Sequence, residues 1–125
     1  MKRGLALACL IVLGTLVIAK GPAYAGATLF TGPVPFETSQ GQNCSAVNVG
    51  GHDLQVEVSA FCSNGDSSLA ICSPLSPGDI CGAGVIGFAT SLSNCHCEIS
   101  VTGGGKKAVR ATLCNVTTGS CSDAR

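Results

Sequence analysis

The fold is decided by the stretch Cys95-His96-Cys97-Glu98-Ile99-Ser100-Val101-Thr102, with Gly103-Gly104-Gly105 and the segment from Lys106 to Cys114 after it. Apolar and polar residues alternate strictly up to Thr102, and the alternation resumes at Val109. Side chains of a strand point to opposite faces with a period of two, so each segment has one apolar face. Glycine readily takes the positive φ values of a tight reversal. The pattern therefore predicts an antiparallel hairpin with cysteines on its buried side.

The first 25 residues have the features of a secretory signal peptide. Lys2 and Arg3 precede an apolar run from Leu5 to Ala19, and Ala23-Tyr24-Ala25 has the small residues of a cleavage site. The run is short for a membrane anchor, and no stop-transfer pattern follows it. We therefore predict a bacterial protein that is cleaved after residue 25. Residues 26–125 would form a single disulfide-rich β domain, secreted or periplasmic.

Residues 26–125 are sparsely charged. They contain four Lys and Arg residues and seven Asp and Glu residues, which gives a net charge of −3. Nucleic acids and anionic membrane surfaces are bound by clustered Lys and Arg. We therefore expect a protein or cell-surface partner, no nucleic acid, and no membrane insertion after signal removal.

Cysteine is the most informative residue type in the composition. Eight cysteines remain after residue 25, and an even number behind an export signal predicts up to four disulfides. Aromatic residues are few and Trp is absent, so we expect disulfides, at about 2–4 kcal/mol each, to matter for stability. The predicted disulfide cysteines are Cys44, Cys62, Cys72, Cys81, Cys95, Cys97, Cys114 and Cys121.

The sequence does not select one disulfide connectivity, but it suggests a hypothesis. Cys62 and Cys72 flank the turn signal Asn64-Gly65 and are expected to pair. Cys114 is expected to hold the tail through Cys121. The other four cysteines are then expected to pair among themselves. Cys95 and Cys97 share one face and should diverge toward different partners. The four are Cys44, Cys81, Cys95 and Cys97.

Six to eight short strands with turn signals between them are predicted along residues 26–125. The clearest alternation after the opening stretch runs from Asp53 to Cys62. We expect an extended or edge segment over 26–42, strands at 44–49, 53–62, 69–72 and 80–89, a polar turn over 91–94, and a tail over 117–125. Glycines at 82, 84 and 87 suggest bulges or irregular pairing. The expected fold is a small antiparallel β-sandwich stapled by disulfides, with immunoglobulin-like topology as one candidate.

Metal binding is the first chemistry to weigh, because Cys95-His96-Cys97 combines thiolate and imidazole, both ligands for zinc or copper. In a strand, however, His96 points away from both cysteines, and oxidised cysteines are not thiolates. The even cysteine count also favours structural bridges over thiol exchange. We therefore predict no metal ligands and no cofactor.

The candidate catalytic residues are His52-Asp53 and the two glutamates Glu57 and Glu98. The glutamates lie on the polar faces of predicted strands. The first pair follows two glycines and is typical of a turn, and solvated strand faces commonly carry carboxylates. The chain has no Gly-x-Ser-x-Gly nucleophile elbow. We therefore expect no catalytic residues and no enzymatic activity.

Two surface features complete the candidates. The segment Lys106-Lys107 with Arg110 predicts a basic tip that is open to a contact role. The Asn-x-Ser/Thr patterns at Asn43 and Asn115 are discounted as glycosylation sites in a bacterial protein.

The sequence favours a noncatalytic binding or structural module. The alternative is a secreted enzyme inhibitor or toxin-like effector that acts through rigid loops such as Ser73 to Asp79.

Overall fold

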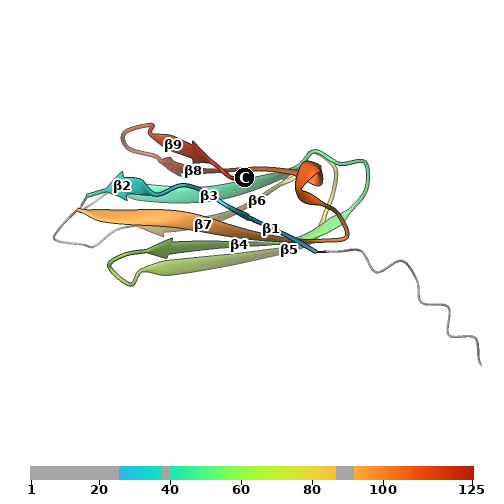
Figure 1. Cartoon of the computed structure of the whole chain (residues 1–125), viewed down its shortest axis with the longest axis horizontal. Coiled ribbons are helices and arrows are strands. Elements are labelled where there is room, and N and C mark those ends of the chain that lie inside the picture. The colour runs from blue at the N-terminus through green and yellow to red at the C-terminus, as the bar shows by residue number, and fades with distance from the viewer. Residues whose placement is uncertain (1–25, 38–39, 87–91) are drawn as a thin grey trace, which may run out of the picture.

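The computed structural model describes residues 26–37, 40–86 and 92–125, which form two facing antiparallel sheets (Figure 1). The first sheet has the order β1-β7-β4-β5, with β2 also paired to β7, and the second has the order β6-β3-β8-β9. The small all-β fold stapled by disulfides is thereby confirmed. The elements are β1 (Ala27–Phe30), β2 (Val34–Phe36), β3 (Gly41–Asn48), β4 (Leu54–Cys62), β5 (Ser67–Leu75), β6 (Ile80–Ile86), β7 (Ser93–Thr102), the short 3-10 helix η1 (Lys106–Ala108), β8 (Val109–Asn115) and β9 (Cys121–Asp123).

The alternation of the sequence correctly identifies the core. Leu54, Val56, Val58 and Ala60 of β4 are buried, as are the alternate residues of β7 from Cys95 to Val101. Most buried side chains are small aliphatic groups or cysteines, and Phe36 is the largest of the fully buried ones. β4 and β7 thus each contribute one face to the layer between the two sheets.

The predicted hairpin between the two halves of the opening stretch is wrong. β7 pairs with β4 in the first sheet, whereas β8 pairs with β3 in the second. Residues 103–108 cross from one sheet to the other, and Gly103 takes a φ of +91° at the start of the crossing. Two strands whose apolar faces meet across a sandwich show the same alternation as two strands side by side. The pattern alone therefore could not distinguish the arrangements.

Several predicted boundaries also differ from the structure. Ser93 and Asn94 belong to β7 rather than to a turn, and β5 extends from Ser67 through Leu75. β3 begins at Gly41, within the predicted lead-in, while β1 and β2 are the short strands expected of an edge segment.

The irregular pairing predicted for the glycine-rich strand is likewise wrong where the structure describes it. β6 pairs with β3 in continuous register from Ile80 to Ile86, and Gly82 and Gly84, which are exposed, keep their places in the ladder. The irregularity lies instead between Leu54 and Val56 in the β4–β5 pair. Residues 87–89 of the predicted strand lie outside the described residues, as does the predicted signal peptide.

Four of the strands, two from each sheet, share part of the immunoglobulin arrangement. If β3, β4, β6 and β7 are compared with strands B, C, E and F, the expected neighbours B–E and C–F are both present. A Cys44–Cys97 disulfide joins β3 to β7 across the sandwich, at the position of the B–F bridge. The outer strands differ, because β1 pairs with β7 and β8 with β3.

One side of the sandwich is closed by backbone hydrogen bonds between the sheets. The Phe30 N–H donates to the Arg125 carbonyl at 3.3 Å, and the Arg125 N–H donates to the Phe30 carbonyl at 3.1 Å. An isolated bridge between Thr31 and Ala124 continues this contact. On the opposite side the outer strands are β5 and β6, which are joined by the Cys72–Cys81 disulfide.

Candidate functional site

The eight predicted disulfide cysteines form four bridges. Two of them, Cys44–Cys97 and Cys72–Cys81, join the two sheets. The other two, Cys62–Cys95 and Cys114–Cys121, join neighbouring strands of one sheet. The predicted Cys114–Cys121 pair is confirmed, as is the divergence of Cys95 and Cys97 toward different partners.

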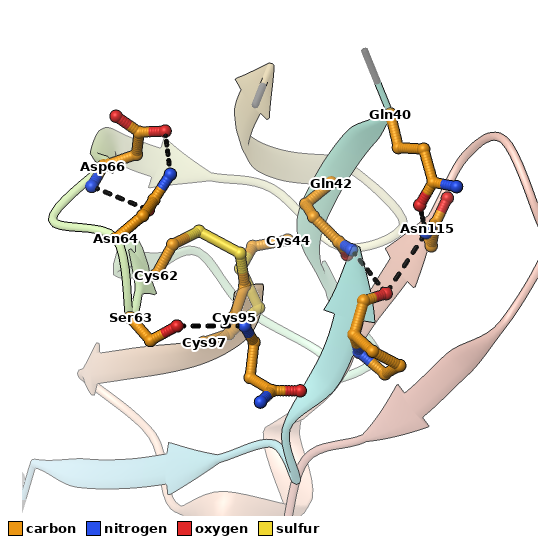
Figure 2. Close-up of a disulfide and its surroundings, with 12 residues drawn as sticks. Gln40, Gln42, Cys44, Cys62, Ser63, Asn64, Asp66, Cys95, Cys97 and Asn115 are labelled. Atoms are coloured by element: carbon orange, nitrogen blue, oxygen red, sulfur yellow. Dashed lines mark hydrogen bonds between the residues drawn. A yellow bond between two sulfur atoms is a disulfide. The ribbon is translucent and has the colours of Figure 1, made fainter. Parts of the chain in front are cut away.

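The predicted Cys62–Cys72 pair is wrong, and the strand register gives the reason. Cys62 lies directly opposite Cys95 in the β4–β7 ladder, with their Cα atoms 4.0 Å apart (Figure 2). Cys72 of β5 lies opposite Val56 of β4, and Val56 is six residues along β4 from Cys62. Cys72 instead bonds Cys81 of the facing sheet. Of the four cysteines predicted to pair among themselves, Cys44 and Cys97 do so. The prediction is wrong for Cys81 and Cys95, which bond Cys72 and Cys62 instead.

The Cys95-His96-Cys97 segment places its cysteines and its histidine on opposite faces of β7. Both cysteines are buried in disulfides, whereas His96 is exposed on the outer face of the first sheet. The His96 ring faces Phe61 of β4, with ring centroids 5.6 Å apart and planes tilted by 31°. This histidine therefore belongs to an outer surface that also contains an aromatic ring.

The candidate catalytic groups are spread over the molecule. His52 is exposed, and its Nε2 lies 2.8 Å from the Gly103 carbonyl oxygen at the end of β7. Seven residues of extended strand, about 20 Å, separate that carbonyl from His96. In the part of the chain that the structure describes, no three His, Cys, Asp or Glu side chains form a group that could hold a metal ion.

The two glutamates are the only candidate catalytic groups that the ladder brings near each other. Glu57 lies opposite Ser100 and Glu98 lies opposite Ser59, so the two carboxylates are diagonal neighbours on β4 and β7. Both belong to the outer face of the first sheet, where Glu57 is exposed and Glu98 is half-buried. They give this face negative charge beside its apolar side chains.

The predicted basic tip is divided between two places. Lys106 and Lys107 are exposed in η1, at the crossing between the sheets, whereas Arg110 lies on the outer face of β8. Asn115 is almost fully buried, and its Nδ2 donates to the Pro35 carbonyl at 3.2 Å and to Gln40 Oε1 at 2.6 Å (Figure 2). In the folded chain this amide is therefore a structural donor.

The loop from Ser73 to Asp79 is held at both ends. Leu75 is buried, and its carbonyl accepts a hydrogen bond from Asn48 Nδ2 at 2.8 Å. The Gly78 N–H donates to the Asn48 carbonyl, also at 2.8 Å. Pro77 and Gly78 are left exposed at the tip. The loop is thus anchored to β3, as a rigid recognition loop would need to be.

An exposed apolar surface, missed by the sequence reasoning, lies at the β4–β5 end of the first sheet. We call Phe61, Leu69 and Ile71, which are 40%, 57% and 60% exposed, the β4–β5 patch. Phe61 lies opposite Ser67 and is a diagonal neighbour of Leu69 on the same face. A shallow groove between the two strands is lined by Ser59, Phe61 and Leu69 among others. Clustered apolar side chains of this kind mark interaction surfaces in folded proteins.

The position of this patch follows from the Cys72–Cys81 disulfide. In β5 small and large residues alternate, and only one set can face the core. Cys72 must face inward to reach Cys81, so Ala70 also faces inward and the larger Leu69 and Ile71 face outward. Hydrophobicity alone would have placed Leu69 and Ile71 in the core. The correct disulfide partner of Cys72 was the signal that could have located the patch.

No family model, curated protein or solved structure matches the chain. Four disulfides are typical of proteins in oxidising extracellular or periplasmic settings. Among the residues that the structure describes, no helix has the length and apolar character required to cross a bilayer.

Proposed function

We propose that this chain is a noncatalytic binding module, exported by a bacterium, that recognises a protein partner through the β4–β5 patch. The observation that carries the proposal is the outward exposure of Phe61, Leu69 and Ile71 together on one face, while the inward positions of β5 hold smaller residues. Aromatic and aliphatic anchors of this kind contribute most of the binding energy in protein interfaces.

The surroundings of the patch suggest the character of the partner. Glu57 is directly opposite Ile71, and Glu98 lies one strand further in, opposite Ser59. On the described part of this outer face there is no Lys or Arg, because all four such residues of the chain after residue 25 lie in η1, on β8 or at the C-terminus. A partner with an apolar contact region bordered by basic side chains would complement it.

The proposal is tested with the full chain, expressed with export to an oxidising compartment, as bait for proteins from the envelope and medium of the producing cells. Partners captured by the wild type should bind the Phe61→Ala variant at least about tenfold more weakly, because truncating an aromatic anchor costs on the order of 2 kcal/mol. Val116→Ala removes another exposed apolar side chain, 65% accessible against 40% for Phe61, from the β8–β9 turn and is the control.

Capture that is equally weakened by both substitutions, or by neither, would contradict binding through the patch. Thermal unfolding of both variants should resemble that of the wild type, because Phe61 and Val116 are both exposed. A loss of capture could then be assigned to the contact surface rather than to the fold.

A second candidate function, inhibition of a partner enzyme, is favoured by the anchored loop from Ser73 to Asp79. Asn48 holds this loop through both its side chain and its backbone, and Cys72 is fixed by its disulfide directly before the loop. A preorganised loop loses little conformational entropy on binding. Inhibition that Pro77→Gly weakens while Phe61→Ala leaves it unchanged would favour this candidate over the patch.

A further inference from the structure

The outer edge of β5 has unpaired backbone groups in the described residues. β5 pairs only with β4, so one side of this nine-residue strand has no neighbouring strand. The Cys62 N–H donates to the Asp66 carbonyl at 2.9 Å, which identifies residues 62 and 66 as a hydrogen-bonded pair. Hydrogen-bonded and non-hydrogen-bonded pairs alternate along an antiparallel ladder. The Ser68 and Ala70 backbone groups therefore bond β4, whereas those of Leu69 and Ile71 point toward the open edge.

From Ser67 to Cys72 this edge lacks the features that usually prevent strands from pairing with other chains, and its register irregularity lies beyond Cys72, near the end of the strand. Natural edge strands are commonly protected by charged side chains, prolines, bulges or short length. Residues 67–78 contain no charged residue, and the first proline in β5 is Pro74, near its end. At the opposite side of the sandwich, by contrast, β1 and the segment after β9 bond each other through Phe30 and Arg125.

We propose that β5 pairs with β5 of a second copy of this chain across a two-fold axis, which joins the two first sheets into one continuous sheet. In an antiparallel register centred on Ala70, Leu69 of each copy lies opposite Ile71 of the other. The free N–H and C=O groups of these two residues then face each other and form hydrogen-bonded pairs. The same two side chains lie on one outer face and would contact their symmetry mates.

A second copy fits this edge better than an unrelated strand for reasons of charge and shape. An uncharged segment meets no like-charge repulsion when it pairs with itself, although residues 26–125 have a net charge of −3. The two-fold arrangement is self-complementary, because the residues that offer backbone groups are those with the exposed apolar side chains. Pairing would also join the two β4–β5 patches, with Phe61 at each outer end. The inference thus goes beyond the proposed binding function, because it is argued from the free backbone groups of β5.

The test uses the exported full chain, with its molar mass measured over about a hundredfold range of concentration. One strand pair is a small interface, so we expect a reversible dimer rather than a permanent one. Amide hydrogen exchange of the same samples locates the contact. The Leu69 and Ile71 amides should become protected as the dimer forms, whereas those of Ser68 and Ala70 should be protected at every concentration, because they bond β4.

Leu69→Pro is the decisive variant, because it removes an N–H that points to the open edge and leaves the bonds to β4 in place. It should remain monomeric at concentrations where the wild type doubles its mass, and the Phe61→Ala control on β4 should still dimerise. If Leu69→Pro disturbs the β4–β5 ladder, exchange in Ser68 and Ala70 will reveal it. The concentration dependence of the wild-type Leu69 and Ile71 amides then decides the question.

A wild type that stays monomeric, or a dimer that Leu69→Pro leaves intact with a protected β4–β5 ladder, would overturn the inference. A monomer that captures a partner protein through Phe61 would end this inference while the proposed binding function remains. A dimer that captures no partner would contradict the proposed binding function and leave this inference standing. The two proposals can therefore fail separately.

Discussion

Single buried amides hold the loops at one end of the sandwich. Asn48 is 1% exposed, and its Nδ2 donates to the His52 and Leu75 carbonyls at 2.9 and 2.8 Å. Its Oδ1 accepts the Gly50 N–H at 2.8 Å. One side chain thus connects the turn after β3 with the end of β5, where the candidate recognition loop begins.

Replacing this amide should be costly. We expect Asn48→Ala to lower the free energy of unfolding by about 2–4 kcal/mol, because it leaves buried backbone groups without their partner. Denaturant unfolding with the disulfides intact measures the change. Asn43→Ala on the exposed face of the same strand is the control and should stay within about 0.5 kcal/mol of the wild type. Similar losses in both variants would show that Asn48 has no special role.

Gln42 is also a buried amide, but we do not expect its replacement to destabilise the protein. Its Nε2 donates to the Pro35 carbonyl at a long 3.3 Å, and no described residue bonds its Oε1 (Figure 2). The Pro35 carbonyl also accepts Asn115 Nδ2 and so keeps a donor without Gln42. Gln42→Met, a substitution of similar shape, should therefore be neutral or stabilising, by up to about 1 kcal/mol in the same unfolding assay. A loss above about 2 kcal/mol would show that Oε1 has a partner in solution.

At the scale of elements, the connection between β7 and β8 determines the topology. Gly103 begins this crossing with a φ of +91°, and a side chain there would force a conformation that L-residues rarely adopt. Gly105 has a φ of −90° and open space where a Cβ would lie. The two glycines of one triplet therefore have different structural roles.

This difference predicts different effects of alanine in one loop. Gly103→Ala should destabilise the protein by about 1–2 kcal/mol. Gly105→Ala should be neutral, or stabilising by up to about 1 kcal/mol, because alanine restricts the unfolded chain. Thermal or denaturant unfolding of the two variants side by side makes the comparison. Equal effects would mean that the crossing does not require a positive φ at residue 103.

The elements also show what the sequence could and could not predict. Alternation predicted the buried faces of β4, β7 and β8 correctly, because burial on one face is a local property of a strand. Cys114, however, lies on the other face of β8 and bonds Cys121, so the prediction that the cysteines share the buried side is wrong for Cys114. Whether β8 lies beside β7 or across the sandwich depends on the path of residues 103–108, which alternation does not report. Facing sheets lie about 10 Å apart, a distance that a six-residue connection can span.

The exposed patch escaped prediction for a related reason. Leu69 and Ile71 are more hydrophobic than Ala70 and Cys72, so composition favours burying the larger pair. The Cys72–Cys81 disulfide requires the reverse, since a cysteine on the outer face of β5 could not reach the facing sheet. A distant covalent partner thus decided which face of the strand is exposed.

In the whole molecule, the two inter-sheet disulfides supply stability that a larger hydrophobic core supplies in other proteins. The described core is built mainly of Val, Ala, Leu and Cys side chains, with Phe36 the one aromatic residue in it. Cys44–Cys97 spans 53 residues of sequence and is fully buried between the sheets. Cys114–Cys121 spans only 7 residues and has an exposed member.

Removing the Cys44–Cys97 bridge should therefore destabilise the protein more than removing the Cys114–Cys121 bridge. Constraining the unfolded chain is worth about 4 kcal/mol for the Cys44–Cys97 loop and about 2 kcal/mol for the Cys114–Cys121 loop. The Cys44→Ala/Cys97→Ala variant should also lose buried packing, so its unfolding midpoint should fall much further than that of Cys114→Ala/Cys121→Ala. Denaturant unfolding of the two double variants measures the order. A larger loss from the short loop would contradict the assignment of structural roles.

Two of the four disulfides, Cys44–Cys97 and Cys72–Cys81, fasten the facing sheets together, and Cys72–Cys81 turns Leu69 and Ile71 outward. Mass-spectrometric mapping of peptides from the exported, unreduced protein tests this arrangement most directly. We expect Cys44 to be linked to Cys97, Cys62 to Cys95, Cys72 to Cys81, and Cys114 to Cys121. A Cys62–Cys72 link, or a free thiol at any of these eight positions, would contradict it.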